Sequence, residues 1–358
     1  MTSKLKLIHV GLGGWGMDWE KTALKTIADR VETVAIVEAF EPALEKAQQA
    51  LKLKKDQCFA TLEDALERGP EADAVLITAP MEAHVPLAIT AMRAGKHVLV
   101  EKPLAGSVEE AIEAVQVAEE TGLVFQVSQN YRFYPAPRKA AELIREGALG
   151  DLGMMNIDFR QWDNDAEAGT HRHYQFVHPL LFDMAIHHMD LIRLVSGAEP
   201  VSVFVQQTDP AWSKYIEEAS ATMIVTLDNG VIVSYRGSWV SSDEPTFWAG
   251  DWRMECEQGL IRWTSRQGGP AGTKGDAVQV RTRDGKVKDI ALDEMQVWGR
   301  SAGVLAFIEA IETGIEPENS GRRNLASVAL MEASARSMAS GQVEEIEVPE
   351  LAGSAPSA

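Results

Sequence analysis

The chain has 358 residues, a length typical of two domains, and each half is long enough to bury its own core. It carries 53 acidic residues against 34 lysines and arginines, which gives a formal net charge of -19. A negative field of that size repels phosphate backbones and anionic membranes, so we expect neither nucleic acid nor a membrane as a partner. No apolar run reaches the roughly 18 residues of a membrane span, and no apolar export segment precedes the first predicted strand, so we expect a cytoplasmic protein.

The first 128 residues alternate short apolar runs with amphipathic stretches. The apolar runs predict strands that are buried on both faces, at residues 5–10, 31–37, 74–78, 97–100 and 123–128. Helical patterns lie between them, as over residues 83–94 and in the stretch that begins with the capping box Ser107-Val108-Glu109-Glu110. Strands that alternate with helices predict a parallel sheet with helices on both faces, here over residues 1–128.

The pattern changes in the second half, where longer strands follow one another. We predict strands at residues 154–161, 201–207, 219–227, 231–239, 278–282 and 286–290. Asn229-Gly230 and Asp284-Gly285 predict tight hairpins, because Asn and Gly accept the positive φ angles of such turns. Helical patterns return at residues 301–312 and 324–340, and residues 129–348 are predicted to form an α+β domain with an open, mainly antiparallel sheet that carries a few helices. Residues 349–358 are predicted to be a disordered tail.

A glycine-rich segment directly follows the first predicted strand. In Gly11-Leu12-Gly13-Gly14-Trp15-Gly16 the glycines allow a tight turn and a close approach of a pyrophosphate to the start of the next helix. Glu38 ends the second predicted strand, at the distance along the chain where a carboxylate accepts hydrogen bonds from the adenosine ribose. The same carboxylate repels a 2′-phosphate, so we expect NAD as the cofactor rather than NADP.

Two further segments carry residues suited to acid–base chemistry. Lys102 lies at the carboxyl end of the strand predicted at residues 97–100, the edge of a parallel sheet where ligands bind, and it can stabilise charge on a substrate oxygen. Asp183, His187 and Asp190 share one face of a predicted helix. His187 suits a general base and Asp183 can orient it. His188 lies on the apolar stripe of that helix and is interpreted as a packed core histidine.

These segments, taken together and in order, resemble the glucose–fructose oxidoreductase/inositol dehydrogenase/rhizopine-catabolism (Gfo/Idh/MocA) family. The matching motifs are Gly11-x-Gly13-x-x-Gly16, Pro80 with His84, the run from Ala94 to Glu101-Lys102-Pro103, Asn130-Tyr131-Arg132-Phe133, and Asp183-x-x-x-His187. The resemblance implies a Rossmann domain followed by an open-faced α/β domain, with the active site between them. It implies Lys102, Asp183 and His187 as the catalytic groups. The cofactor-binding residues that we expect are Gly11, Gly13, Gly14, Trp15, Gly16, Glu38, Thr78, Pro80, His84, Glu101, Lys102 and Asn130.

The chain departs from the family pattern just before the catalytic aspartate. Many members carry Gly-Gly there, whereas this chain has His178-Pro179-Leu180-Leu181. The family also includes glycosidases that use NAD transiently and regulators that bind NAD without turnover. Both remain alternatives to our leading hypothesis, an NAD-dependent dehydrogenase that transfers a hydride from a carbinol of a sugar or an inositol-like polyol.

Several other residues are of types that can bind a metal or a substrate. His171, His173 and His178 lie close in sequence, but no cysteine or carboxylate cluster accompanies them, so we expect a polar loop over the active site and no metal. Arg132, Arg160 and Trp162 are candidate substrate contacts. Cys58 and Cys256 are far apart, in no metal-ligand spacing, and predict no disulfide framework.

The second half contains too few helices to cover both faces of its predicted sheet. Residues 201–207 and 231–239 place apolar side chains on both sides of the strand alternation. A sheet face that is apolar and uncovered needs another chain to cover it. We therefore expect a homodimer or homotetramer that pairs through this face, as the family resemblance also implies.

Overall fold

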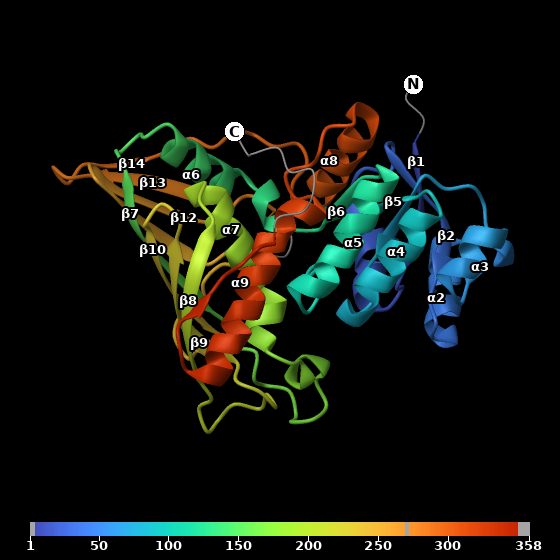
Figure 1. Ribbon diagram of the computed structural model, residues 1–358, viewed down its shortest axis with the longest axis horizontal. Helices are drawn as coiled ribbons and strands as arrows, with labels where there is room; N and C mark the ends of the chain where they lie inside the picture. Colours follow the sequence, from blue (N-terminus) through green and yellow to red (C-terminus); the bar gives the residue numbers. More distant parts are fainter. Residues whose placement is uncertain (1–3, 269–271, 350–358) are drawn as a thin grey trace. The chain divides into compact units, whose positions relative to one another are not determined.

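The computed structural model describes residues 4–268 and 272–349, and the chain divides into two compact units (Figure 1). Within the described residues, the first unit holds the chain up to Gln129 together with Arg300–Val328, and the second holds Asn130–Gly299 with Ala329–Val348. The expected second domain therefore differs from the second unit, because the chain returns to the first unit near its end. There the side-chain amide of Gln126 donates to the Gly303 carbonyl at 2.8 Å. The predicted tail lies outside the described residues from position 350 on.

The first unit contains a parallel sheet with strand order β3-β2-β1-β4-β5-β6 among the described residues, which confirms the predicted Rossmann-type architecture. Its strands are β1 (Leu5–Val10), β2 (Val31–Val37), β3 (Cys58–Phe59), β4 (Ala74–Ile77), β5 (His97–Val100) and β6 (Phe125–Val127). Its helices are α1 (Gly14–Asp18), η1 (Trp19–Leu24), α2 (Glu41–Leu51), η2 (Lys55–Gln57), α3 (Leu62–Arg68), η3 (Met81–Ala83), α4 (His84–Arg93), α5 (Val108–Thr121) and α8 (Gly299–Thr313). The central strands are buried on both faces, which explains their unbroken apolar sequence.

The start of α5 shows how local sequence fixes a helix boundary. Ser107 Oγ accepts a hydrogen bond from the Glu110 backbone N–H at 3.3 Å, as the capping box predicts. The Glu110 carboxylate bonds the Gly106 N–H at 3.3 Å rather than that of Ser107, so the reciprocal half of the box is displaced by one residue. The helix ends at Gly122, whose φ of +66° is one that glycine adopts without strain.

The second unit is built on a mainly antiparallel sheet with strand order β14-β13-β12-β11-β7-β10-β9-β8-β15 among the described residues. Its strands are β7 (Leu152–Arg160), β8 (Pro200–Thr208), β9 (Ser220–Leu227), β10 (Ile232–Ser238), β11 (Asp251–Cys256), β12 (Gly259–Thr264), β13 (Ala277–Thr282), β14 (Val287–Asp289) and β15 (Glu344–Glu345). Among the described strands of this sheet, β7 and β10 are the one parallel pair. Both hairpins predicted from Asn-Gly and Asp-Gly are confirmed, between β9 and β10 and between β13 and β14. The sequence patterns did not predict β11 and β12.

Helices cover one face of this sheet (Figure 1). They are η4 (Asn130–Phe133), α6 (Pro135–Arg145), η5 (Arg172–Gln175), η6 (Pro179–Ala185), α7 (Ile186–Ser196) and the last part of α9 (Gly321–Ser340). Over residues 4–268 and 272–349, no helix combines the length and the apolar character that a membrane crossing requires.

The other face of the sheet is open and mixes apolar with charged side chains, whereas the predicted oligomer assumed an apolar face: Ile224 of β9 is 48% exposed there. Tyr235 and Val233 of β10 turn towards the helices and are fully buried, whereas Arg236 is exposed. On the open face Asp158 forms ion pairs with Arg236 at 2.6 Å and with Arg253 at 3.6 Å. Alternate residues of a strand point to opposite faces of the sheet, and this alternation places these three charged side chains on the open face. Pairing of two chains remains a prediction.

The turn into η6 holds a histidine in a conformation that favours glycine. His178 has φ +45° and ψ +56°, the left-handed region, and it immediately precedes Pro179. Its backbone N–H donates to Glu217 Oε2 at 2.6 Å, and its ring Nδ1 lies 3.3 Å from the same oxygen. Although this turn lacks the Gly-Gly pair, its backbone still adopts a left-handed conformation at His178. The hydrogen bond to Glu217 helps to stabilise that conformation, which glycine would adopt without strain.

Substitution at His178 tests this reading of the turn. The free energy of unfolding of His178→Gly should lie within about 1 kcal/mol of the parent's. Glycine adopts the left-handed conformation without strain, and this gain offsets the lost contact of the imidazole ring. His178→Val should lose about 1–3 kcal/mol, since a β-branched side chain is disfavoured at positive φ. Both variants keep the backbone bond to Glu217, so the comparison isolates the φ angle. Urea denaturation measures the difference, and equal stabilities of the two variants would contradict the reading.

Candidate active site

The glycine-rich turn between β1 and α1 uses its glycines in two different ways. Gly11 and Gly16 are required by packing: Gly11 has φ +91°, and a Cβ on Gly16 would lie 1.9 Å from the Gly11 carbonyl oxygen. Gly13 and Gly14 have no atom within 4 Å of a built Cβ. The first turn of α1 has no side-chain cap for its backbone N–H groups. Open space beside uncapped N–H groups fits a pyrophosphate, and the residues present thus suit a dinucleotide.

Glu38 and Thr78 support this turn from the ends of β2 and β4. One Glu38 oxygen accepts the Leu12 backbone N–H at 2.8 Å and the other accepts that of Phe40 at 2.9 Å. Thr78 is buried and its hydroxyl donates to the Gly11 carbonyl at 2.7 Å. The structure thus brings the expected ribose-binding carboxylate against the turn itself.

The two tryptophans near the turn share one buried carboxylate. Glu101 is 5% exposed, and its Oε1 accepts the indole N–H groups of Trp15 at 2.9 Å and Trp19 at 2.7 Å. Its Oε2 accepts the backbone N–H of Lys102 at 3.0 Å. The Arg300 guanidinium lies 4.4 Å above the Trp15 ring. Glu101 therefore ties the cofactor turn to the backbone of the expected catalytic lysine.

His84 holds the neighbouring loops through their backbone. Its ring nitrogens lie 2.7 Å from the Pro103 carbonyl and 2.9 Å from the Ala79 carbonyl, and the Lys102–Pro103 peptide is cis. Burial lowers the pKa of His84, which favours the neutral ring. His84 thus bridges the ends of β4 and β5, whereas Pro80 is exposed at the start of η3.

In the second unit, a buried ion pair fixes the helix that carries His187. Arg132 Nε donates to Asp190 Oδ2 at 2.9 Å, and its Nη2 donates to Oδ1 at 2.8 Å. The two side chains are 6% and 2% exposed. Arg132 was a candidate substrate contact, but this geometry engages its guanidinium with Asp190 and makes it a positioning residue for α7.

Tyr131, next to Arg132, stacks flat on the imidazole of His187. The ring centroids are 3.9 Å apart and the planes differ by 6°. The Arg266 guanidinium lies 4.2 Å from the Tyr131 ring and donates to its hydroxyl. Burial raises the pKa of Tyr131 to about 12, so the hydroxyl stays protonated. His187, 6% exposed, is thereby held in one orientation.

Asp183 lies in the π-helical segment η6, which directly precedes α7, and not in a regular α-helix as predicted. π-helical segments are rare in proteins overall, but those that occur often lie at functional sites. His173 Nε2 lies 3.3 Å from Asp183 Oδ2, and His173 Nδ1 lies 2.7 Å from Asp163 Oδ2. Burial alone lowers the pKa of His173, but bonds to Asp183 and Asp163 outweigh it and hold that pKa above its ordinary value.

His188 is the packed core histidine that the sequence predicted. It is fully buried, and its ring nitrogens lie 3.0 Å from the Tyr235 hydroxyl and 3.0 Å from the Trp248 carbonyl. Burial lowers its pKa to about 4, so the ring is neutral near pH 7. It has no place among the proton-transfer groups.

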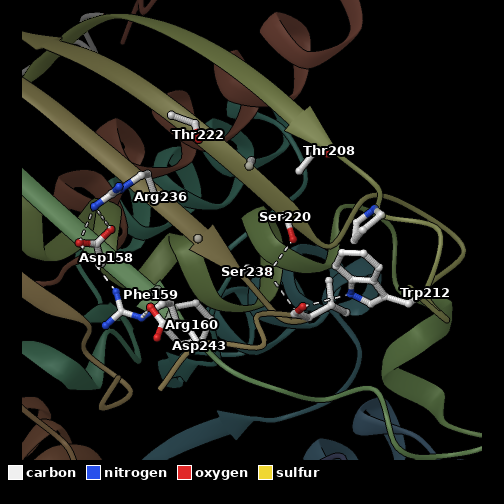
Figure 2. A pocket seen from close by; sticks show the side chains of 14 residues that line it. Asp158, Phe159, Arg160, Thr208, Trp212, Ser220, Thr222, Arg236, Ser238 and Asp243 are labelled. Carbon is white, nitrogen blue, oxygen red and sulfur yellow. Dashed lines mark hydrogen bonds and ion pairs between the residues drawn. The ribbon is translucent and has the colours of Figure 1, made fainter. Parts of the chain in front are cut away.

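The two other candidate substrate residues lie at the end of β7 and just beyond it. Arg160 points to the open face of the sheet, where it pairs with Asp251 at 3.2 Å and lines a pocket of about 520 Å³ with Asp158 and Arg236 (Figure 2). Its neighbour Phe159 faces the other way and packs against His188. Trp162 is 44% exposed, and its indole N–H donates to Asp165 at 2.8 Å.

Sequence reasoning missed three residues around the proposed catalytic pair. Tyr131 stacks on His187, Arg266 donates to the Tyr131 hydroxyl, and Asp163 contacts His173, which lies beside Asp183. Tyr131 belongs to the Asn130-Tyr131-Arg132-Phe133 motif, in which only Asn130 and Arg132 were expected to contact ligands. Asp163 follows Trp162, and continued alternation from β7 places it on the face of the sheet that the helices cover. That alternation is the feature of the sequence that could have predicted its position. Nothing near Arg266 in the sequence marked it.

The glycines of the turn allow a matched test of the cofactor site. Gly13→Ala should leave the thermal midpoint unchanged, since nothing meets the added methyl group, yet weaken NAD binding by about tenfold or more where the pyrophosphate approaches. Gly16→Ala should lose about 1–3 kcal/mol or more of stability, because its Cβ meets a backbone carbonyl. Calorimetric NAD titration and thermal unfolding measure both. Native NAD affinity in Gly13→Ala would overturn the assignment.

Two family models match the chain in succession. Residues 6–129 match the oxidoreductase family with an NAD-binding Rossmann fold, and residues 138–262 match the GFO/IDH/MocA C-terminal domain. The two matches cover the glycine-rich turn, Lys102, Asp183 and His187.

Known proteins resemble the chain over nearly its whole length. Inositol 2-dehydrogenase of Rhizobium meliloti is 27% identical over 347 residues, which are 95% of this chain and 98% of that protein. The aldose-aldose oxidoreductase of Caulobacter crescentus has a TM-score of 0.81 at 20% identity, covering 96% of this chain and 100% of the other. The WlbA dehydrogenase of Bordetella pertussis, in complex with NADH and UDP-GlcNAcA, has a TM-score of 0.78 at 22% identity, with 97% and 100% covered. At these identities the two solved structures show the shared fold alone. With the family models they establish that the chain belongs to the Gfo/Idh/MocA family and is an NAD-binding oxidoreductase.

Proposed function

We propose that the protein is an NAD-dependent dehydrogenase that oxidises a carbinol of a sugar or an inositol-like polyol. The observation that carries the proposal is the orientation of His187: a nearly buried imidazole, held flat against Tyr131, with Asp183 in the turn before it. An NAD-binding regulator has no need of a fixed base beside a carboxylate. The relative named as an inositol 2-dehydrogenase supports the polyol class.

His187 acts as the general base and takes the hydroxyl proton of the substrate. Asp183 stabilises the imidazolium that forms, and His173 in turn holds the Asp183 carboxylate. Tyr131 limits the imidazole to one plane, so the base loses little orientational freedom when it reacts. Bound nicotinamide supplies the hydride acceptor.

Lys102 of the first unit is assigned to the same reaction. Its ammonium group polarises the substrate oxygen and stabilises negative charge as the proton leaves. Glu101 fixes the Lys102 backbone and Trp15 together, which keeps the lysine in register with the cofactor turn. Asn130 begins the second unit and is 7% exposed; we retain it as a cofactor contact.

A substrate screen separates this function from its two rivals. Monosaccharides and inositols are incubated with NAD, and NADH absorbance is followed. Net NADH formation supports the dehydrogenase. Hydrolysis of nitrophenyl glycosides without net NADH points to a glycosidase, in which the hydride returns within one turnover. NAD binding without any turnover points to a regulator.

Loss of either proposed acid–base partner should be severe. Lys102→Ala and His187→Ala should each lower kcat by about a hundredfold or more, the usual scale for a positioned proton-transfer or electrostatic group. NAD affinity should change little in His187→Ala. If both residues act on one transition state, the double variant should lose less than the product of the single losses. A single variant with near-native kcat on the true substrate contradicts the mechanism.

Glu38 should set the choice between NAD and NADP. Glu38→Ser with Ala39→Arg removes the repulsion of a 2′-phosphate and adds a partner for it. The ratio of kcat/KM for NAD over NADP should fall by about tenfold or more, equivalent to about 1.4 kcal/mol. Because Glu38 also accepts the Leu12 N–H, NAD binding should weaken as well. Ala39→Arg alone is the control, and a parent enzyme that prefers NADP would refute the assignment.

A further inference from the structure

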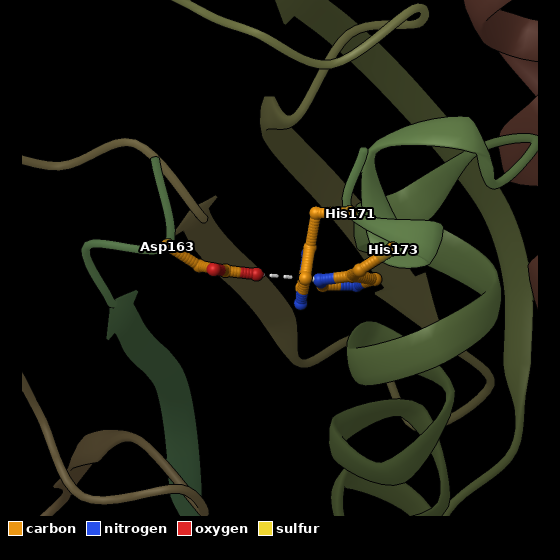
Figure 3. Close-up of side chains that lie close together, drawn as sticks. All are labelled: Asp163, His171 and His173. Atoms are coloured by element: carbon orange, nitrogen blue, oxygen red, sulfur yellow. Dashed lines mark hydrogen bonds and ion pairs between the residues drawn. The ribbon is translucent and has the colours of Figure 1, made fainter. Parts of the chain in front are cut away.

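Asp163, His171 and His173 converge in the second unit although they come from two segments (Figure 3). One potential ligand atom from each lies within 4.8 Å of the other two. His173 Nδ1 is 2.7 Å from Asp163 Oδ2, and the two imidazole rings are 6.2 Å apart and nearly perpendicular. The absence of a carboxylate beside these histidines led us to expect no metal, and the fold supplies that carboxylate from the end of β7.

The convergence is held by the surrounding backbone and aromatic side chains. The Asp163 N–H donates to the Trp239 carbonyl at 2.8 Å, which fixes the residue on the end of β10. The Tyr174 N–H donates to the His171 carbonyl at 3.1 Å, and the buried Tyr174 ring packs 4.9 Å from the His171 ring. Both segments are therefore anchored beside the cluster.

The donor set is that of a borderline transition-metal ion. Two imidazoles and one carboxylate suit Zn²⁺ and its neighbours, whereas Mg²⁺ and Ca²⁺ prefer oxygen ligands alone. Bonds of about 2 Å at tetrahedral angles place ligand atoms about 3.3 Å apart. The three potential ligand atoms lie within 4.8 Å of one another, which is on the same scale as that separation.

The second layer of contacts matches that of metal-binding histidines. A ligating imidazole commonly donates its other N–H to a carboxylate, which fixes the tautomer. His173 Nε2 lies 3.3 Å from Asp183 Oδ2, at ion-pair distance, so Nδ1 can offer its lone pair on the side of Asp163. The Tyr215 hydroxyl donates to Asp163 Oδ2 at 2.9 Å and orients that carboxylate.

We propose that Asp163, His171 and His173 bind one divalent transition-metal ion of the zinc class, with Asp183 as the carboxylate behind His173. This ion site goes beyond the proposed dehydrogenase chemistry and shares Asp183 and its contact His173 with it, so the test below measures ion binding and not turnover. The structure offers a competing arrangement without an ion, in which a protonated His173 bridges Asp163 and Asp183.

Calorimetric titration of the full-length protein, with any affinity tag removed and metals stripped by EDTA, tests the site. Zn²⁺ should bind with a stoichiometry of one ion per chain, and Co²⁺ should give the visible absorption of a nitrogen- and oxygen-ligated site. His171→Gln should weaken binding by at least about tenfold, since even loss of an outer contact costs about 10–100-fold. His171 is exposed, so this variant should keep the parent's thermal midpoint.

His178→Asn is the matched control. His178 lies nearby along the chain but outside the cluster, and asparagine tolerates its left-handed backbone. This variant should keep the parent's metal affinity, while Asp163→Asn should lose it as His171→Gln does. Absence of stoichiometric binding by the parent overturns the proposal in favour of the ion-free bridge. Equal weakening in His178→Asn and His171→Gln overturns it as adventitious binding to surface histidines.

Discussion

The buried ion pair between Arg132 and Asp190 is the constraint on which the proposed catalytic residues of the second unit depend. Two parallel hydrogen bonds join η4 to α7 where solvent is nearly excluded. Removing one partner would leave an uncompensated buried charge, which costs about 3–5 kcal/mol. Tyr131 precedes Arg132 and His187 lies one turn before Asp190, so the same pair sets the stack of Tyr131 on His187. The orientation of the proposed base is thus decided by residues that need not touch substrate.

Polar side chains behind this stack form a continuous chain of contacts. Asp163, His173 and Asp183 alternate carboxylate, imidazole and carboxylate, and Tyr215 closes one end. Such an arrangement fixes the direction of the Asp183 carboxylate, whether the imidazole between the two carboxylates carries two protons or one proton and an ion. It also explains the irregular backbone around it. The π-helical turn η6 and the left-handed His178 bring Asp183 to the network at a cost that Glu217 partly offsets.

The open face of the second sheet shows the limit of reasoning from alternation alone. Apolar side chains were expected on both faces of the sheet, and the register assigns Val233 and Tyr235 to the helices while it leaves Arg236 on the open face together with Ile224. A face of this mixed character can pair with another chain through apolar contacts together with hydrogen bonds and ion pairs that require matched geometry. Hydrophobic cover alone is therefore an incomplete physical reason for an assembly.

The sequence alone determined the parallel sheet of the first unit, the glycine-rich turn, both hairpins and the family, because each depends on local spacing: apolar runs, glycines and Asn-Gly or Asp-Gly pairs. It also placed His188 correctly in the core from helical periodicity. Only the tertiary structure decided that Arg132 binds Asp190, that Arg160 faces away from α7, and that Asp163 meets His173. Those contacts join residues 10 to 58 positions apart or depend on which face of a strand is covered. Pairings of that kind follow from the packing of whole elements, and no local pattern encodes them.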